Sequence, residues 1–421
     1  MKVLNVLVGA GIRLGGTSAF VAEGAVELGK LGADVGVVAT DIALAPWGYA
    51  QRQRRLGPDE LHPALDPSGV RIFAARFPRR LAFSPDLARW LSREAAQYEV
   101  LHIHNLWQFP QYAAARASRR HRLPYVVSPH GGLDPYLRHR GRIRKRVSTA
   151  LWQRRMLEGA ALIHVTTEAE REAIADVAPH VPRAVVPCGI HAEEFAHLPP
   201  RDVFRRERLG GYEGPVILYL GRITEKKGLD VLVRAFARVR RARACQLVIA
   251  GPDDSRMLPS ISRLASALGV RSHVKFVGPI YGEARLAALS CADVWALSSH
   301  TENFGIAVVE AMAAGRAVAV SPSVSVSSDV AAARAGVVAE PEPRAFAQAL
   351  LDVLADDHAR VQLSHAARDF AARYDWKVVA PRLLRMYRAA LSGETRATPA
   401  GARRDRLPPE PAPSAPPQGP R

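Results

Sequence analysis

The stretch VWALSSHTENFGIAVVEAMAAGRAVAV, residues Val294 to Val320, decides the expected fold. Its two apolar ends, VWAL and AVAV, predict strands, and the Ala-rich segment between them predicts a helix from about Gly305 to Ala314 that ends at Gly315. A strand, a helix and a second strand in this order are typical of a parallel sheet with a crossover helix. Glu310 lies within the apolar helix, and a second carboxylate, Glu302, lies in the loop before it. A carboxylate in an apolar segment is unfavourable unless a partner pairs with it.

The loop before this helix is a candidate ligand site. It contains Glu302, Asn303, Phe304 and Gly305, and Ile306 follows at the start of the helix. Open α/β sheets bind ligands at the carboxyl ends of their strands, and the free amides of a helix N-terminus suit a phosphate group. Two interpretations of the carboxylates are open. Either Glu310 faces the same crevice as the loop, or Glu302 is an ordinary loop acid and Glu310 a surface residue.

Short apolar runs alternate with helical patterns along the whole chain of 421 residues. In the first half the expected strands are Val3–Val8, Asp34–Ala39, Val70–Ala74, Val100–His104, Pro124–Ser128, Leu162–Thr166 and Arg183–Val186. In the second half they are Val216–Leu220, Gln246–Ala250, Val274–Val277, Val294–Leu297, Ala317–Val320 and Gly336–Val338. The pattern restarts after Pro199 and Pro200, so we expect an α/β fold with two doubly wound domains.

These patterns divide the chain into four segments. We expect the two domains at residues 1–200 and 201–375, a final helix at 376–392 and a tail at 393–421. The stretch Pro343 to Ala372 is expected to be helical, and the final helix is expected to break or kink at Pro381. The tail is rich in Pro, Arg and Ala and has almost nothing to bury, so its composition predicts disorder.

A cluster of cations follows the first strand of the second domain. In LYLGRITEKKGLDVLVRAF, Leu218 to Phe236, Arg222 comes directly after the strand and Lys227 opens the next helix. An arginine fork and a lysine point charge at this position suit a diphosphate. The alternative is a charged connecting loop, which a chain this basic supplies often. The first domain offers a weaker signal, because the glycines of GAGIRLGG, which include Gly15 and Gly16, only approach the dinucleotide fingerprint.

Histidines lie on one strand of the first domain and directly after another. His102 and His104 share one face of the strand VLHIH, and we interpret them as hydrogen-bonded structural residues. His130 stands before two glycines that allow a ligand to approach closely, and Asp134 is near enough to join it. A metal site would need a third ligand that the sequence does not show, so none is expected. The three cysteines form no CxxC pair and are expected to be inert, buried thiols.

The formal net charge of +18 raises the question of an anionic partner. The segment Leu137 to Arg155 contains eight basic residues and no acidic one, with apolar residues between them. This pattern fits a basic amphipathic helix on an anionic membrane surface, or simply a solvated face. No apolar run is long enough to span a membrane, and the chain start lacks the features of a secretory signal, so we expect a cytoplasmic protein.

Taken together, these motifs resemble the retaining glycosyltransferases of family 4, which have the GT-B fold of two facing Rossmann-like domains. The resemblance covers roughly residues 1 to 392, and it is carried by ENFG and EAMAAG around Glu302 and Glu310, by GRITEKKG, by the Gly15-Gly16 pair and by SPHGGLDP. SPHGGLDP followed by a basic helix looks most like the bacterial subgroup that builds exopolysaccharide, capsule or O-antigen. ENFG stands where many members have EGFG, which puts the identity of the sugar in doubt.

The resemblance implies roles for the matching residues. The first domain would bind the acceptor, the second would bind a nucleotide sugar, and the final helix would cross back onto the first domain. Glu302 would contact the donor sugar and Glu310 the ribose hydroxyls. His130 would lie beside the transferred sugar. The diphosphate and base would be held by Gly15, Gly16, Arg222, Lys227, the loop Asn303 to Ile306, and the segment with Phe276 and Gly278.

The implied reaction moves a glycosyl group from a nucleotide-diphosphate sugar to a hydroxyl of a growing glycan or lipid-linked acceptor. Arg222, Lys227 and the helix N-terminus would stabilise the leaving diphosphate without a metal or other cofactor. Three alternatives stay open. A nucleotide-sugar epimerase of the same fold is the nearest, a nicotinamide dehydrogenase is disfavoured by the broken fingerprint, and a nucleic-acid-binding protein is suggested by charge alone.

Overall fold

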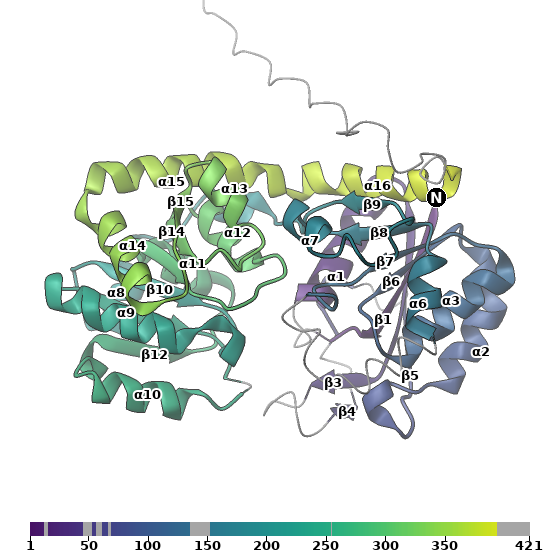
Figure 1. Cartoon of the computed structure of the whole chain (residues 1–421), viewed down its shortest axis with the longest axis horizontal. Coiled ribbons are helices and arrows are strands. Elements are labelled where there is room, and N and C mark those ends of the chain that lie inside the picture. Colours follow the sequence, from purple (N-terminus) through teal and green to yellow (C-terminus); the bar gives the residue numbers. More distant parts are fainter. Residues whose placement is uncertain are drawn as a thin grey trace, which may run out of the picture.

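Two parallel sheets organise the chain into the two lobes shown in Figure 1. The computed structural model describes residues 1–11, 16–44, 53–55, 61–65, 69–134, 152–253 and 255–393. The first sheet has the order β5-β2-β1-β6-β7-β8-β9 and the second the order β12-β11-β10-β13-β14-β15. Both orders reverse beside the first strand of the sheet, so each sheet is doubly wound as predicted.

The first sheet contains seven strands: β1 (Lys2–Gly9), β2 (Asp34–Thr40), β5 (Val70–Phe73), β6 (Val100–His104), β7 (Tyr125–Ser128), β8 (Leu162–Val165) and β9 (Arg183–Val185). A short antiparallel pair, β3 (Ile42–Leu44) and β4 (Gln53–Arg55), lies outside it. The helices of the first lobe are α1 (Gly16–Lys30), α2 (Pro85–Glu94), α3 (Phe109–His121), α6 (Arg154–Glu158) and α7 (Glu168–Ala173). Separate apolar clusters fill its two faces, one with α1 and one with α2 and α3.

The second sheet contains six strands: β10 (Val216–Leu220), β11 (Gln246–Ala250), β12 (Val274–Gly278), β13 (Val294–Leu297), β14 (Ala317–Val320) and β15 (Gly336–Val338). Its helices are α8 (Arg201–Leu209), α9 (Leu229–Ala242), α10 (Leu258–Ala267), α11 (Gly282–Cys291), α12 (Ile306–Ala313), α13 (Ser327–Ala332), α14 (Pro343–Ala355) and α15 (Asp357–Ala371). Strands β10, β11, β13 and β14 are buried along their whole length. This burial explains their continuous apolar sequences.

The helix predicted from the opening stretch is α12, and its ends are set by two glycines. Gly305 caps its start with φ +94°, and a Cβ there would meet Val324 Cγ1 at 3.0 Å. Gly315 follows its end with φ +65°. Side chains rarely adopt either conformation, so these glycines fix where the helix begins and ends.

The helical stretch predicted from Pro343 to Ala372 is wrong in one respect, because it is divided at Asp356. This residue ends α14 and caps α15, with an extended backbone at φ −124° and ψ 111°. Its carboxylate accepts hydrogen bonds from the backbone amides of His358 and Ala359. An aspartate that caps one helix cannot continue another, which is the physical reason for the division.

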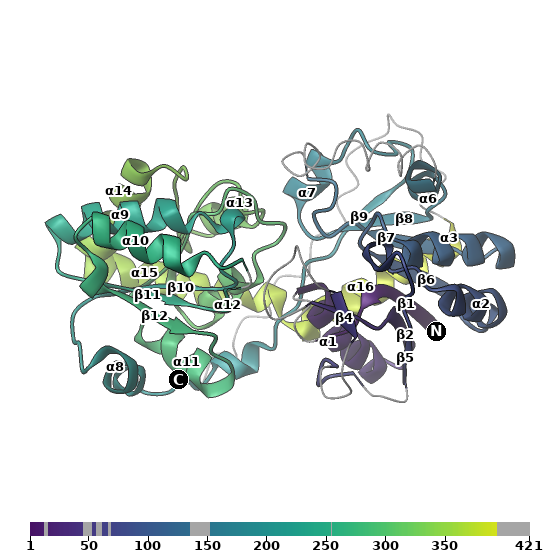
Figure 2. The ribbon, with the colours of Figure 1, turned by 90° about the horizontal axis from the view of Figure 1, so that it is seen from below.

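The last helix, α16 (Trp376–Ser392), leaves the second lobe and packs against the first (Figure 1, Figure 2). It continues through Pro381 without a break in the helix. Its apolar face joins the core beneath α1, where Trp376 and Tyr387 are fully buried. Gly189 is required beside it, because a Cβ there would lie 2.3 Å from the Trp376 ring. Burial of each such large side chain stabilises the fold by about 2 to 3 kcal/mol.

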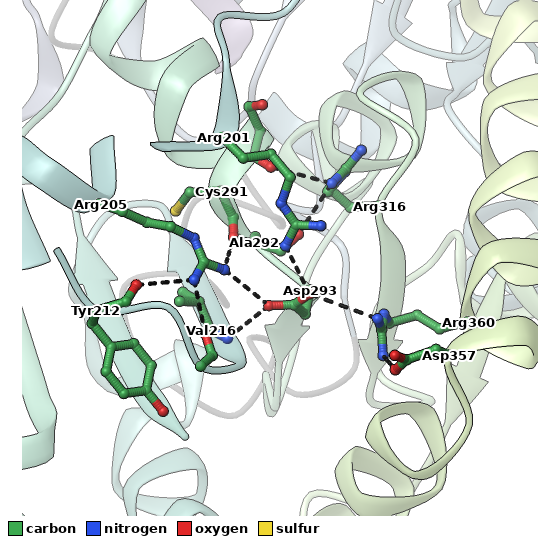
Figure 3. A network of polar contacts seen from close by, with 12 residues as sticks. Arg201, Arg205, Tyr212, Val216, Cys291, Ala292, Asp293, Arg316, Asp357 and Arg360 are labelled. Carbon is green, nitrogen blue, oxygen red and sulfur yellow. Dashed lines mark hydrogen bonds and ion pairs between the residues drawn. The ribbon is translucent and has the colours of Figure 1, made fainter. Parts of the chain in front are cut away.

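An aspartate whose side chain is only 8% exposed ties together the amino-terminal edge of the second sheet (Figure 3). Asp293, directly before β13, accepts hydrogen bonds from Arg201 at 2.7 Å, from Arg205 at 3.3 Å and from the Val216 amide at 2.9 Å. Arg360 from α15 lies 3.8 Å away. Open α/β sheets bind ligands at the carboxyl ends of their strands. Because this network lies at the opposite edge, it stabilises the fold and is not part of a ligand site.

Candidate active site

A cavity of about 1230 Å³ lies between the carboxyl ends of the two sheets. Among the residues that the first lobe contributes are Gly16, Glu23 and His130. The second lobe contributes Arg222, Lys226, Arg285, Glu302, Asn303, Phe304, Gly305, Ile306 and Glu310. Residues from both halves of the sequence therefore form one site, and α12 presents its N-terminus to it.

Glu302 is paired inside the site with Lys227. The Lys227 ammonium donates to Glu302 Oε2, and both side chains are only 15% exposed. Burial alone would raise the pKa of Glu302, but the charges of Lys227, Lys226 and Arg222 outweigh it and hold the pKa below its usual value. Glu302 is therefore an ionised acceptor, and Lys227 supports it. It is the neighbouring Lys226 that lines the cavity beside Arg222.

Glu310 has a partner that the sequence did not reveal. Arg285, on α11, donates to Glu310 Oε1 at 2.5 Å and to Glu194 Oε2 at 2.6 Å. Its guanidinium also lies over the Phe195 ring, 5.4 Å from the centroid. Burial raises the pKa of Glu310, and the charge of Arg285 opposes that rise. Arg285 and Glu194 both line the cavity, so they are site residues that the sequence analysis missed.

The two lobes touch beside the site. Gly131 has φ +72°, and a Cβ on it would lie 2.9 Å from the Asn303 Cβ. Thr301 Oγ1 donates to Asp134 Oδ2 at 2.7 Å. Gly131 and Asp134 belong to the first lobe, whereas Thr301 and Asn303 belong to the second. The structure therefore has the loops around His130 and Glu302 in contact.

His130, which is half-buried, lines the cavity beside three buried histidines, His102, His104 and His164. Its Nε2 lies 2.9 Å from His104 Nδ1, and the ring of Phe20 packs 6.0 Å from its own. Burial lowers the pKa of His130 to about 3 and that of His164 to about 4, and it holds the pKa values of His102 and His104 well below the ordinary value. These rings are uncharged at neutral pH.

Several predicted residues lie elsewhere. Asp134 does not line the cavity, and it bonds to Thr301 instead. Phe276 lies beneath the Arg271 guanidinium at 5.1 Å, and the Gly278 carbonyl accepts from the Gly251 amide at 2.8 Å. Neither of them lines the cavity.

Some predictions fall outside the described residues. These are the role of Gly15, the tail from residue 394 and most of the basic segment Leu137 to Arg155. In the described part of that segment, α6 begins at Arg154, which pairs with Glu158 at 2.7 Å. Among the described helices, none combines the length and apolar character needed to cross a membrane.

The described residues include no group of three or more His, Cys, Asp or Glu side chains arranged to hold a metal ion. Of the cysteines, Cys245 and Cys291 are buried as predicted, and burial raises their pKa values to about 11. Cys188 differs, because it is only half-buried and lines the cavity. Burial raises the pKa of its thiol, so it is protonated at neutral pH.

Two family models match the chain. Residues 201–370 match the family described as "Glycosyl transferases group 1", and residues 15–189 match the "Glycosyl transferase 4-like domain". The matches meet near Pro199 and Pro200, and each covers one of the two sheets. The fold and its central cavity thus define a two-domain protein of the GT-B class. The chain belongs to the glycosyltransferases of family 4 within that class.

Curated relatives agree with this assignment, and solved structures share the fold. D-inositol 3-phosphate glycosyltransferase of Frankia alni is 29% identical over 90% of this chain and 95% of its own. Phosphatidyl-myo-inositol mannosyltransferase of Mycobacterium leprae is 29% identical over 73% of this chain and 78% of its own. HepE from Anabaena, solved with UDP and glucose, has a TM-score of 0.72 at 20% identity and covers 92% of this chain and 100% of its own. Sucrose-phosphate synthase from Thermosynechococcus elongatus has a TM-score of 0.71 at 22% identity over 93% and 99%.

Proposed function

We propose that this glycosyltransferase takes its sugar from a nucleotide-diphosphate sugar and transfers it to an acceptor hydroxyl with retention at the anomeric carbon. The observation that carries the proposal is the shared cavity, in which Glu302, Glu310 and three cations from the second lobe lie in one lining with His130 from the first. A nucleotide sugar presents hydroxyls and phosphates together. The carboxylates of this lining can accept hydrogen bonds from the hydroxyls, and its cations can bind the phosphates. The Anabaena neighbour, which was solved with UDP and glucose, supports this donor class.

The leaving diphosphate would lie near Arg222, Lys226 and the N-terminus of α12, all of which line the cavity. Positive charge and free amides at this place stabilise the negative charge that develops as the glycosidic bond to phosphate breaks. Because these groups supply the positive potential that a metal ion supplies in other enzymes, we expect activity to persist in EDTA. No other cofactor is required by this chemistry.

The transfer step breaks the bond between the anomeric carbon and the diphosphate oxygen, and it forms a bond from that carbon to the acceptor oxygen. The acceptor proton passes to the departing phosphate oxygen, which lies on the same face as the incoming hydroxyl. Each described carboxylate that lines the cavity already accepts from a donor: Glu23 from Trp376, Glu194 and Glu310 from Arg285, and Glu302 from Lys227. His130, with its pKa near 3, is a weak base. These partners favour proton transfer to the leaving group over a separate protein base.

The acceptor class is a separate matter. The two curated relatives are named for D-inositol 3-phosphate and for phosphatidyl-myo-inositol, and the predicted exopolysaccharide, capsule or O-antigen role stays a prediction. Both possibilities share an acceptor hydroxyl on a polar or lipid-linked molecule. Binding of the segment Leu137 to Arg155 to an anionic membrane surface also stays a prediction. Nucleic acid is not an expected partner.

The experiment is a turnover assay followed by proton NMR. UDP-glucose, GDP-mannose and ADP-glucose would each be mixed with the protein and EDTA, with myo-inositol 3-phosphate or phosphatidyl-myo-inositol vesicles as acceptor. We expect one donor to be consumed with an acceptor present and to give a product with the anomeric configuration of the donor. An inverted product would overturn retention, and an epimerised nucleotide sugar formed without acceptor would indicate an epimerase instead.

A further inference from the structure

Four histidines of the first lobe, His102, His104, His130 and His164, form two separate hydrogen-bond chains. In the first, His164 Nε2 lies 2.8 Å from the Val186 carbonyl, which can only accept, so this nitrogen carries the proton. His164 Nδ1 then accepts from Ser128 Oγ at 2.6 Å, and Ser128 accepts from His102 Nε2 at 2.6 Å. The Tyr387 hydroxyl closes this chain at His102 Nδ1, at 2.8 Å. Every proton in the first chain is placed by its partners.

The second chain leads to the cavity. Asn5 Oδ1, on β1, lies 2.9 Å from His104 Nε2, and His104 Nδ1 lies 2.9 Å from His130 Nε2. Asn5 is 3% exposed and His104 is fully buried, so neither can exchange its partner for water. A carboxamide oxygen accepts, and His104 Nε2 therefore carries the proton of that neutral ring. His104 Nδ1 is then an acceptor, and the proton between the two histidines belongs to His130 Nε2.

The remaining ring nitrogen of His130 is left with a lone pair. His130 Nδ1 makes no hydrogen bond to the described residues, and these residues do not enclose it. Since His130 lines the cavity, this nitrogen is open to it.

The backbone around His130 is held as firmly as the ring. Glu170, on α7, accepts from the Gly131 amide at 3.3 Å and from the Thr166 amide and hydroxyl at 2.8 Å each. Phe20 packs against the rings of His130, His104 and His164. Neither the tautomer nor the orientation of His130 is therefore left to solvent.

We propose that Asn5 and His104 are positioning residues that keep His130 protonated at Nε2, so that its Nδ1 accepts a hydrogen bond from one hydroxyl of the transferred sugar. The contact between His130 and the sugar rests on the proposed function, whereas the relay through Asn5 and His104 is new. A ring whose cavity-facing nitrogen, Nδ1, can only accept selects a donor sugar that carries a hydroxyl at this position. It disfavours a sugar with a deoxy carbon or a carboxylate there, because these groups cannot donate.

The first test measures the tautomer directly. Protein labelled with ¹⁵N-histidine would be studied by long-range ¹H–¹⁵N NMR at pH 7, without ligand. We expect the wild-type His130 to be protonated at Nε2, and Asn5→Leu to give a mixture of tautomers or the Nδ1 form. Tyr387→Phe is the matched control, because it removes one buried polar atom from the first chain only, and it should leave His130 unchanged. A wild-type His130 protonated at Nδ1 would overturn the proposal without any variant.

The second test measures specificity. The donor would be whichever of UDP-glucose, GDP-mannose and ADP-glucose the wild type turns over, compared with analogues that each lack one sugar hydroxyl. For one analogue we expect kcat/KM to fall about tenfold in the wild type and in Tyr387→Phe, which is the loss typical of one hydrogen bond. In Asn5→Leu the fall should shrink to less than about threefold, as expected once the acceptor is no longer fixed.

The two tests separate the relay from the proposed function. If no nucleotide sugar is turned over, the proposed function fails, and the ligand-free spectrum still decides whether Asn5 and His104 set the tautomer. If turnover occurs and Asn5→Leu keeps both the tautomer and the full penalty for the missing hydroxyl, the relay is wrong. A stability loss in Asn5→Leu that Tyr387→Phe matches, with no change in specificity, would also overturn it.

Discussion

At the scale of single residues, the carboxylate in the apolar stretch GIAVVEAMAAG has its partner in Arg285. The sequence predicted that Glu310 needs a partner, since an isolated buried carboxylate is unfavourable. It could not predict which one, because Arg285 lies 25 positions earlier on a different helix, and the two side chains meet only in the folded chain. In the same way the sequence indicated the cation Lys227, but only the fold shows that Lys227 turns to Glu302 and that the neighbouring Lys226 lines the cavity.

Arg285→Met should weaken donor binding in a pH-dependent way. Without this cation, burial raises the pKa of Glu310 further, so the carboxyl becomes protonated as pH falls and no longer accepts from donor hydroxyls. We expect the KM for the donor to rise more at pH 6 than at pH 8. The folded state would also lose about 2 kcal/mol of stability, less than a fully buried pair because the side chains are partly exposed.

The stability loss in Arg285→Met should grow as pH rises. A carboxyl whose folded pKa is raised favours folding only while it is protonated, and this contribution is lost as pH rises through that pKa. Urea unfolding at pH 5, 6.5 and 8 measures the effect. A variant whose donor KM keeps the wild-type pH profile would contradict the role given to Arg285.

Lys227→Met should lower turnover more than it weakens donor binding. It leaves Glu302 buried without the ion pair, in a site where charge develops only during the reaction. We expect kcat to fall about 100-fold, by analogy with the loss of one group that stabilises a transition state. Lys377→Met is the control. Lys377 forms an ion pair with the exposed Glu193, with 3.1 Å between Nζ and Oε2, and neither residue lines the cavity. Equal kcat values for Lys227→Met and the wild type would remove Lys227 from the mechanism.

At the scale of elements, the strands were the most predictable part of the chain. Five expected strands of the second sheet, such as Val216–Leu220 and Ala317–Val320, have the predicted bounds. Four of them are buried along their whole length and therefore read as continuous apolar runs. The hairpin of β3 and β4 was missed, since Gln53–Arg55 has no apolar pattern. The division at Asp356 was missed because amphipathic periodicity continues across it, and only the capping bonds reveal it.

The histidines on β6, on β8 and in the loop after β7 predict a loss of stability in mild acid. Their folded pKa values are depressed, to about 3 for His130 and about 4 for His164, below the ordinary value of 6.5. Above pH 6.5 they impose no penalty, and below it the unfolded chain binds protons that the folded chain cannot. Each such histidine should lower the free energy of unfolding by about 1.4 kcal/mol per pH unit in this range.

Urea unfolding between pH 7 and pH 5 measures this slope. Replacing the exposed His358 with Gln should leave it unchanged, because His358 lies on α15, far from this group. Stability that does not change between pH 7 and pH 5 would show that the buried rings accept protons.

At the scale of the whole molecule, the sequence predicted two doubly wound sheets but not how they meet. The site depends on that meeting, since His130 and Glu302 come from different lobes and the Gly131 and Asn303 loops touch. These contacts involve residues more than 150 positions apart, which no local pattern encodes. The resemblance to a family implied the crossing of the final helix, and α16 packs on α1 through Trp376.

Two truncations should therefore behave differently. Ending the chain after Gly393 removes the Pro-rich tail, and we expect the melting temperature to change by less than about 2 °C, with activity unaffected. Ending it after Asp375 removes Trp376, Leu383 and Tyr387 from the first core, and it should lower the melting temperature by more than about 10 °C. Calorimetry of both chains is the measurement, and a large loss from the first truncation would show that the tail has a structural role.

The most direct test of the central claim is a thermal-shift comparison of the wild type with Glu310→Gln across UDP-glucose, GDP-mannose and ADP-glucose. A ligand present at 100 times its Kd stabilises the folded state by about 2.7 kcal/mol. We predict that one of these nucleotide sugars raises the wild-type melting temperature by about 5 °C, and that Glu310→Gln loses most of this shift. If none of them shifts the wild type at millimolar concentration, or if Glu310→Gln shifts equally, the cavity is not a nucleotide-sugar site of the kind proposed.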